Sequence, residues 1–117
     1  MNDQTRQRVI RLLGLGVRAR GAIVGLEQVR DGVRKGKVFF VAVAPDVSEN
    51  SLDKLMPLLD AKRVRYTQEI PAADLGALAG RPTTAAIGVT DRQLANGIRD
   101  LVWPRASAVG DGSNQAE

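Results

Sequence analysis

A chain of 117 residues with 44% apolar and only 3% aromatic residues has the size of one domain with an aliphatic core. It contains no Cys and no His, which excludes disulfides, Cys/His zinc sites, Cys nucleophiles and His-based catalysis. The net charge is +4; residues 1–37 hold nine Lys or Arg against three Asp or Glu, whereas residues 38–117 hold eight against ten. This basic surplus favours a polyanionic partner on one face, although a solvated basic helix gives the same count.

Three absences bear on where the protein works. A chain without Cys favours the cytoplasm over a secreted compartment. No apolar run approaches the roughly 20 residues that a membrane span needs. The first residues, MNDQTRQR, are not followed by the apolar segment of a signal peptide. We therefore expect a cytoplasmic protein.

The first third of the chain predicts a helix, a short strand and a second helix. Residues 4–19 carry apolar positions at helical spacing. These positions are Val9, Leu12, Leu13, Gly16 and Val17. Residues 22–24 predict a short strand, and Gly25 allows a turn. A second helix is expected over residues 26–35, with Gly36 as its C-terminal stop.

The run VFFVAVA, residues 38–44, is continuously apolar. A strand that does not alternate is covered on both faces, so this run predicts a central strand. A third helix is expected next, capped by Asn50 or Ser51. Its core face consists of Leu52, Leu55, Met56 and Leu59. Pro57 lies inside this helix and is expected to kink or break it.

The second half continues the alternation of strands and helices. Residues 65–68 predict a short strand, and Pro71 suits the first turn of a fourth helix that stops at Gly80. Residues 84–89, TAAIGV, predict a further buried strand. Helices that alternate with strands in this way indicate an α/β fold, a sheet sandwiched between two helical layers.

The last helix is expected to begin with a capping box, in which Thr90 is the N-cap and Gln93 the N3 residue. It should end before Pro104. Residues 105–117 are small and polar, and we expect them to form a disordered tail behind a single domain over residues 1–104.

No enzyme chemistry is indicated. Gly14 and Gly16 form G-x-G inside a helical pattern, whereas a phosphate-binding loop follows a strand. Asp46 follows the central strand, but the preceding strand end offers no second carboxylate for Mg²⁺, so a capping or loop-bonding role is favoured. No G-x-S-x-G or S-x-x-K arrangement occurs. We expect no catalytic residue, no metal site and no cofactor.

The segment LLGLGVRARGAIVGLEQVRDGVRKGKVFFVAVAPDVSENSLDKL, residues 12–55, resembles a known family in order and spacing. The match continues through PAADLGALAGRP and TTAAIGVTD and covers roughly residues 5–103. The family is the ribosomal-protein and kink-turn-RNA-binding family L-seven-Ae/L-thirty-e, and the chain is most similar to its small bacterial, YlxQ-type members. The resemblance implies a three-layer α/β/α sandwich with a mixed four-stranded sheet.

The resemblance also implies a non-enzymatic RNA-binding protein that docks a structured RNA, either kink-turn-like or ribosomal. No membrane and no small-molecule substrate is expected as a partner. The family's RNA site is the N-terminus of the second helix with the loop after the fourth helix. A helix N-terminus presents free N–H groups and partial positive charge to phosphate. The candidate RNA-binding residues are Arg18, Arg20, Gly25, Leu26, Glu27, Gln28, Arg30, Asp31, Arg81, Pro82 and Thr83.

Two departures from the family pattern leave an alternative open. Many RNA-binding members have Asn-Glu at the positions of Glu27 and Gln28, and a lysine at the position of Asp31. The charges at the two ends of the second helix also suit its dipole without any RNA. The alternative is a protein-interaction module on the same fold that has lost specific RNA recognition. Its partner would meet the acidic residues Asp46, Glu49 and Asp53.

Overall fold

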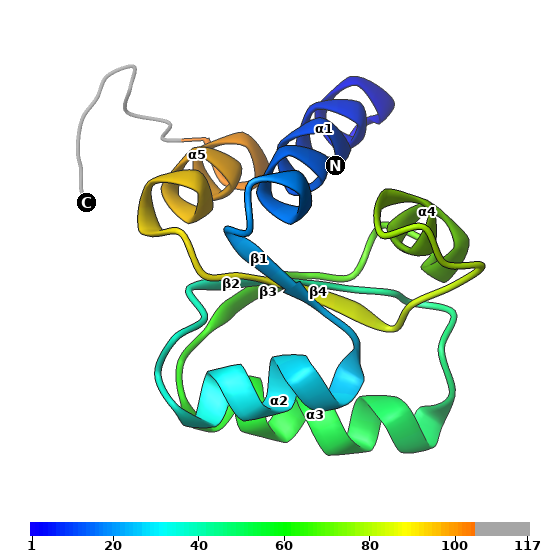
Figure 1. Cartoon of the computed structure of the whole chain (residues 1–117), viewed down its shortest axis with the longest axis vertical. Helices are drawn as coiled ribbons and strands as arrows, with labels where there is room; N and C mark the ends of the chain where they lie inside the picture. The colour runs from blue at the N-terminus through cyan, green and yellow to red at the C-terminus, as the bar shows by residue number, and fades with distance from the viewer. Residues whose placement is uncertain (105–117) are drawn as a thin grey trace.

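Four short strands form one mixed sheet in the computed structural model, which describes residues 1–104 (Figure 1). The strands are β1 (Ala22–Val24), β2 (Phe40–Val43), β3 (Arg65–Thr67) and β4 (Ala86–Val89), in the spatial order β1-β4-β2-β3. β4 is antiparallel to β1 and β2, and β2 is parallel to β3. Every residue of β2 and β4 is buried, which confirms that the apolar run around β2 is a central strand.

Five helices cover the two faces of this sheet (Figure 1). α1 (Asp3–Arg18), α4 (Ala72–Leu78) and α5 (Arg92–Val102) lie on one face, and α2 (Leu26–Arg34) and α3 (Glu49–Ala61) lie on the other. The predicted three-layer α/β/α sandwich with a mixed four-stranded sheet is therefore confirmed. The disorder expected for the C-terminal tail falls outside the described residues.

The core is divided by the sheet into two aliphatic clusters. Along β2, Phe40 and Ala42 belong to the cluster under α1, α4 and α5, while Val41 and Val43 belong to the cluster under α2 and α3. Successive side chains of a strand point to opposite faces, so one continuous apolar strand supplies both clusters. Burial on both faces fixes β2 in its register and gives the other elements a rigid reference.

α3 differs from its prediction at two places. Its N-cap is Ser48, whose Oγ accepts a hydrogen bond from the Ser51 N–H at 3.1 Å, so the expected cap at Asn50 or Ser51 is wrong. Of the kink or break expected at Pro57, the break is wrong, because α3 is one uninterrupted helix. Pro57 is exposed, and so is Asp53, whose carbonyl loses its helical donor. Water can solvate that carbonyl, which makes the proline tolerable.

α5 begins one residue later than predicted. Asp91 is the N-cap, and its Oδ1 accepts a hydrogen bond from the Leu94 N–H at 2.9 Å, so the capping box from Thr90 to Gln93 is wrong. The Thr90 N–H instead donates to the Gly21 carbonyl at 2.8 Å, which holds Thr90 at the sheet edge.

Removing the cap of α5 tests this assignment. Asp91→Ala is expected to lower the free energy of unfolding by about 1 kcal/mol, since it leaves a helix N–H without its side-chain acceptor. Thr90→Ala should cost clearly less, because its hydroxyl caps no helix. Urea unfolding followed by far-ultraviolet circular dichroism measures both; an equal loss for the two variants would contradict the assignment.

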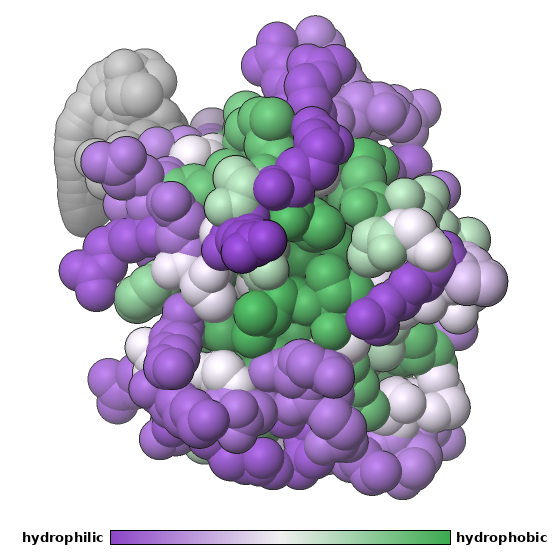
Figure 2. Space-filling model, viewed as in Figure 1, coloured by the Kyte–Doolittle hydropathy of each residue, from purple (hydrophilic) through white to green (hydrophobic). Residues whose placement is uncertain are grey.

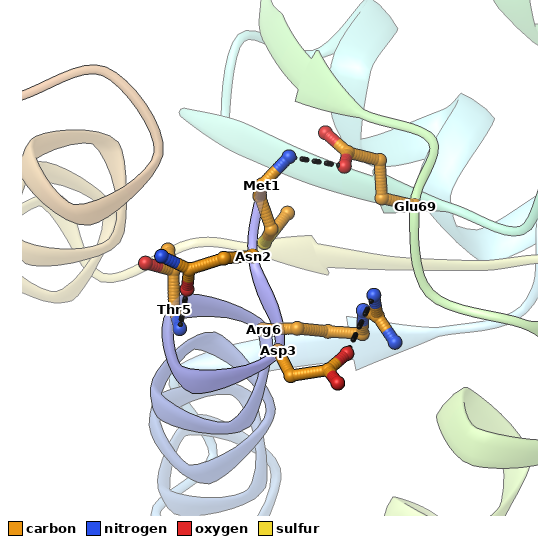
Figure 3. Close-up of polar contacts among 6 residues, drawn as sticks. All are labelled: Met1, Asn2, Asp3, Thr5, Arg6 and Glu69. Carbon is orange, nitrogen blue, oxygen red and sulfur yellow. Dashed lines mark hydrogen bonds and ion pairs between the residues drawn. The ribbon is translucent and has the colours of Figure 1, made fainter.

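The start of α1 is fixed by local and distant contacts (Figure 3). Asn2 caps the helix through a 2.7 Å hydrogen bond from the Thr5 N–H to Asn2 Oδ1. Asp3 pairs with Arg6 at 3.0 Å. The Met1 ammonium group pairs with Glu69, in the segment between β3 and α4. These contacts tie the first turn of α1 to the other half of the chain.

Candidate nucleic-acid interface

Gly25 turns the chain from β1 directly into α2. Its φ is +105°, in the region that disfavours side chains, and its N–H donates to the Ala86 carbonyl at 2.9 Å. A Cβ at this position would lie 2.7 Å from Oε1 of Gln28. The turn therefore requires glycine, and it places the N-terminus of α2 at one end of the sheet (Figure 1).

The first N–H groups of α2 are free. Gly25 is the N-cap and has no side chain to accept a hydrogen bond, and the first helical bond runs from the Val29 N–H to the Gly25 carbonyl at 2.9 Å. Among the described residues, the N–H groups of Leu26, Glu27 and Gln28 find no protein acceptor. An uncapped helix N-terminus of this kind attracts anions through its donors and its dipole.

An open groove of about 600 Å³ lies in front of these N–H groups. We call it the Gly25 groove. It is bordered by the start of α2, the loop from β2 to α3, the start of α4 and the loop from α4 to β4. Its lining residues are Gly25, Leu26, Glu27, Gln28, Asp46, Val47, Ser48, Ser51, Ala72, Arg81, Thr83, Thr84 and Ala85. Six of the predicted site residues thus come together: Gly25, Leu26, Glu27, Gln28, Arg81 and Thr83.

Arg81 reaches the groove because its loop folds back tightly on α4. The Arg81 N–H donates to the Gly76 carbonyl at 2.9 Å, and the Thr84 N–H donates to the Ala72 carbonyl at 3.1 Å. A Cβ on Gly25 would lie 3.4 Å from Nη1 of Arg81, so the guanidinium stands beside the α2 N-terminus. A cation and a set of free N–H groups therefore face the same space.

Two further helix starts border the groove, but both are capped. Ser48 caps α3, as described above. Oδ1 of Asp46 accepts a 2.8 Å hydrogen bond from the Ala72 N–H at the start of α4, where the preceding Pro71 has no side-chain acceptor to offer. The loop-bonding role predicted for Asp46 is confirmed. Of the three helix N-termini at this groove, only that of α2 lacks a side-chain cap.

The lining contributed by Ser48, Ser51 and Thr84 was missed by the sequence reasoning. A signal existed, because the loop that follows the buried strand β2 leaves the sheet at the same edge as Gly25. That signal could not be used without knowing that β4 lies between β1 and β2.

Several predicted residues lie outside the groove lining. Arg30 lies on the side of α2 that faces α3, where Nη1 contacts Glu27 Oε1 at 2.8 Å and Nε donates to the Lys54 carbonyl at 3.2 Å. The carboxylate of Asp31 pairs with Lys35 at 3.0 Å. Pro82 belongs to the Arg81 loop but does not line the groove.

Arg18 and Arg20 are exposed at the C-terminal end of α1, away from the lining of the groove. A Cβ on Gly14 would lie 3.3 Å from Nη1 of Arg18 and 3.4 Å from Cδ2 of Leu78, so Arg18 lies back along α1 beside α4. Figure 2 shows an apolar centre on this face, over β1, with hydrophilic side chains above and below it. Arg18 and Arg20 both precede β1, the strand that leads to Gly25.

The glycines of the G-x-G pattern lie within α1, as expected from its periodicity, and not in a strand-to-helix loop. Within residues 1–104, no group of three or more His, Cys, Asp or Glu side chains is placed to hold a metal ion. No helix in this part of the chain is long and apolar enough to cross a membrane.

The family model of the "Ribosomal protein L7Ae/L30e/S12e/Gadd45 family" matches residues 7–98. The chain belongs to this family. The match runs from α1 to α5 and so includes every element that borders the Gly25 groove.

Two curated relatives are named RNA-binding protein YlxQ. The protein from Enterococcus faecium is 29% identical over 102 residues, which cover 87% of this chain and 98% of that protein. The protein from Bacillus subtilis (strain 168) is 30% identical over 91 residues, which cover 78% of this chain and 91% of that protein.

Solved structures show the same fold. A protein of unknown function from Bacillus halodurans C superposes with a TM-score of 0.74 at 28% identity, covering 80% of this chain and 95% of that one. The Giardia lamblia 15.5kD RNA binding protein superposes with a TM-score of 0.75 at 19% identity, covering 87% and 88%. The second likeness concerns the fold alone. The resemblance stated from the sequence is confirmed by these matches.

Proposed function

We propose that the protein is a non-enzymatic, cytoplasmic RNA-binding protein that docks a structured RNA, kink-turn-like or ribosomal, at the Gly25 groove. The observation that carries the proposal is the uncapped N-terminus of α2 beside the Arg81 guanidinium. Family membership supports it, as do the names of the two curated relatives.

Each side of the groove has a part in this proposal. The free N–H groups at the start of α2 and the Arg81 guanidinium bind phosphate oxygens, which positions the RNA. At the base edges that a kinked RNA exposes, the Gln28 amide donates and accepts hydrogen bonds, and the Glu27 carboxylate accepts them. Arg18 and Arg20 add phosphate contacts along the approach to β1.

The two acidic residues of α2 are each paired with a nearby basic side chain. Glu27 is paired with Arg30, and Asp31 is paired with Lys35. These pairs reduce the repulsion between each carboxylate and an approaching phosphate, although exposed pairs do so only partly. The departures from the family pattern are therefore compatible with RNA binding.

Titration of a fluorescent kink-turn RNA and a plain duplex of equal length tests the proposal, at salt concentrations of about 50 and 200 mM. We expect tighter binding of the kink-turn, lost in the double variant Glu27→Ala/Gln28→Ala. Affinity should fall steeply with salt, with a log–log slope of about −0.7 to −0.9 for each phosphate contact. Equal, salt-sensitive binding of both RNAs would indicate a generic basic RNA-binding face and would contradict kink-turn recognition.

Failure of both RNAs to bind at low salt would instead favour the protein-interaction module. The acidic residues that such a partner would meet, Asp46, Glu49 and Asp53, are all exposed, and Oδ1 of Asp46 is bonded to the start of α4.

A further inference from the structure

A second surface with features of a ligand site lies at the opposite end of the sheet from the Gly25 groove. Its centre is Trp103, the only tryptophan of the chain, which is 41% exposed at the end of α5. The Phe40 ring meets the Trp103 ring edge-on at 6.1 Å between centroids, and Cζ of Arg65 lies 5.4 Å from the centre of the indole. The indole is thus held in place while much of it stays accessible.

One hollow adjoins this indole, and a second hollow shares its two arginines. One, of about 290 Å³, is lined by Arg65, Arg99, Asp100 and Trp103. The other, of about 310 Å³, is also lined by Arg65 and Arg99 and extends to Lys62 and Arg63 at the end of α3. The Trp103 surface is defined here by Lys62, Arg63, Arg65, Arg99, Asp100 and Trp103. Its cations continue from the indole into the second hollow, whose lining also includes the apolar residues Val33, Val38, Phe39 and Val64.

The positive charge of this surface is not neutralised by ion pairs within the described part of the chain. In residues 1–104, no ion pair involves Lys62, Arg63, Arg65 or Arg99. Asp100 is the one acidic side chain in the lining of the two hollows. Lys62 and Arg63 near the end of α3 complement its dipole, and Arg99 in the last turn of α5 does the same there. Arg65 lies in β3 and has no such role.

Arg63 directly follows the C-terminal end of α3. Its φ is +56°, in the left-handed region that glycine favours after a helix. Gly36 and Gly80 occupy the corresponding positions after α2 and α4, with φ of +71° and +69°. Arginines occupy this position after two other helices, Arg20 after α1 with φ of +62° and Arg63 after α3, where Arg63 adds a cation to the Trp103 surface.

The placement separates this surface from the groove. β2 begins with Phe40, which contacts Trp103, and runs toward Asp46 at the groove. In Figure 1 the ends of α2 and α3 and the start of β3 lie at the left, while the starts of α2 and α3 lie at the right. A ligand at one end leaves the other end open.

We propose that the Trp103 surface binds a single-stranded RNA segment, with a base stacked against Trp103 and its phosphates along Arg65, Arg99, Lys62 and Arg63. An unpaired base has a free π-face that stacks on indole and on guanidinium planes, whereas the bases of a duplex are inaccessible to such stacking. An acidic peptide would use the cations but not the aromatic ring. This proposal does not depend on recognition at the Gly25 groove.

Trp103 is its own probe, because no other tryptophan contributes to the fluorescence. Titration with oligouridylate of about 10 nucleotides is expected to quench the emission saturably. Arg65→Gln/Arg99→Gln should weaken binding about tenfold or more, and should flatten the log–log salt slope by about 1.4, since two phosphate contacts are lost. Anisotropy of labelled RNA measures the variant, because removing Arg65 also changes the fluorescence baseline.

Two control variants distinguish binding at the Trp103 surface from an effect of net charge and from binding at the Gly25 groove. Arg8→Gln/Arg11→Gln removes the same charge from exposed positions of α1 and should leave quenching almost unchanged. Arg81→Gln should also leave it unchanged, whatever it does at the groove. Circular dichroism establishes that each variant is folded.

Three results would overturn the proposal. RNA that binds by anisotropy without altering Trp103 emission would place the strand elsewhere. If Arg8→Gln/Arg11→Gln weakened RNA binding as much as Arg65→Gln/Arg99→Gln, the loss of affinity would be an effect of net charge. Quenching by oligoglutamate with the same affinity as by oligouridylate would make the surface a site for an acidic protein.

Discussion

Gly76→Ala is expected to lower the free energy of unfolding by about 1–3 kcal/mol. The added Cβ would lie 2.6 Å from Cα of Thr83, 2.7 Å from its N and 2.7 Å from the Arg81 carbonyl oxygen. All three are backbone atoms, so no side-chain rotation relieves the clash. α4 and the Arg81 loop must move apart. Urea unfolding measures the loss.

Gly97→Ala is the matched control for this variant. Gly97 also lies within a helix, α5, but a Cβ there meets nothing within 4 Å. Alanine should therefore raise the free energy of unfolding by about 0.5–1 kcal/mol, through helix propensity alone. A neutral or stabilising Gly76→Ala would mean that the loop does not pack on α4 as described, and Arg81 would then lose its support beside Gly25.

The layers of the fold could be predicted because the central strand is unambiguous in sequence. Residues 38–44 are apolar without alternation, and β2 is buried on both faces. The flanking helices carry their own apolar periodicity, and the chain alternates between helix and strand. Such signals are local, so no knowledge of the sheet order was required.

The helix starts were predicted less well, because neighbouring residues compete for the same role. Ser48, Asn50 and Ser51 are all good N-caps in isolation, and so are Thr90 and Asp91. The backbone distinguishes between them, because Ser48 and Asp91 have extended dihedrals directly before their helices and their side chains accept from the helix N–H groups. Capping propensity alone does not predict which of these residues becomes the N-cap, because the tertiary structure selects it.

In the candidate site, too, local features could be predicted from the sequence and tertiary contacts could not. Gly25 and the charge order of α2 are visible in sequence, and the resemblance added the Arg81 loop. The sheet order brings that loop to Gly25, and Gly76 permits the close approach. Arg30 illustrates the opposite case, since its hydrogen bond to the Lys54 carbonyl depends on the packing of α2 against α3.

Arg81→Gln is expected to weaken binding of a structured RNA about tenfold, or about 1.4 kcal/mol. The guanidinium is exposed beside the free N–H groups of α2, where a phosphate would accept from both. Removal of one such phosphate contact should also reduce the magnitude of the log–log salt slope by about 0.7 to 0.9. Fluorescence anisotropy at several salt concentrations measures the affinity and the slope together.

Lys54→Gln provides the matched control, since Lys54 is exposed on α3 and lines neither the Gly25 groove nor the two hollows of the Trp103 surface. Both variants remove one positive charge, so any effect of net charge is common to them. A larger loss for Arg81→Gln would locate the RNA at the groove, whereas equal losses would contradict a specific contact there. Because the Arg81 N–H holds its loop to Gly76 through the backbone, the glutamine variant should keep the loop in place and remove only the charge.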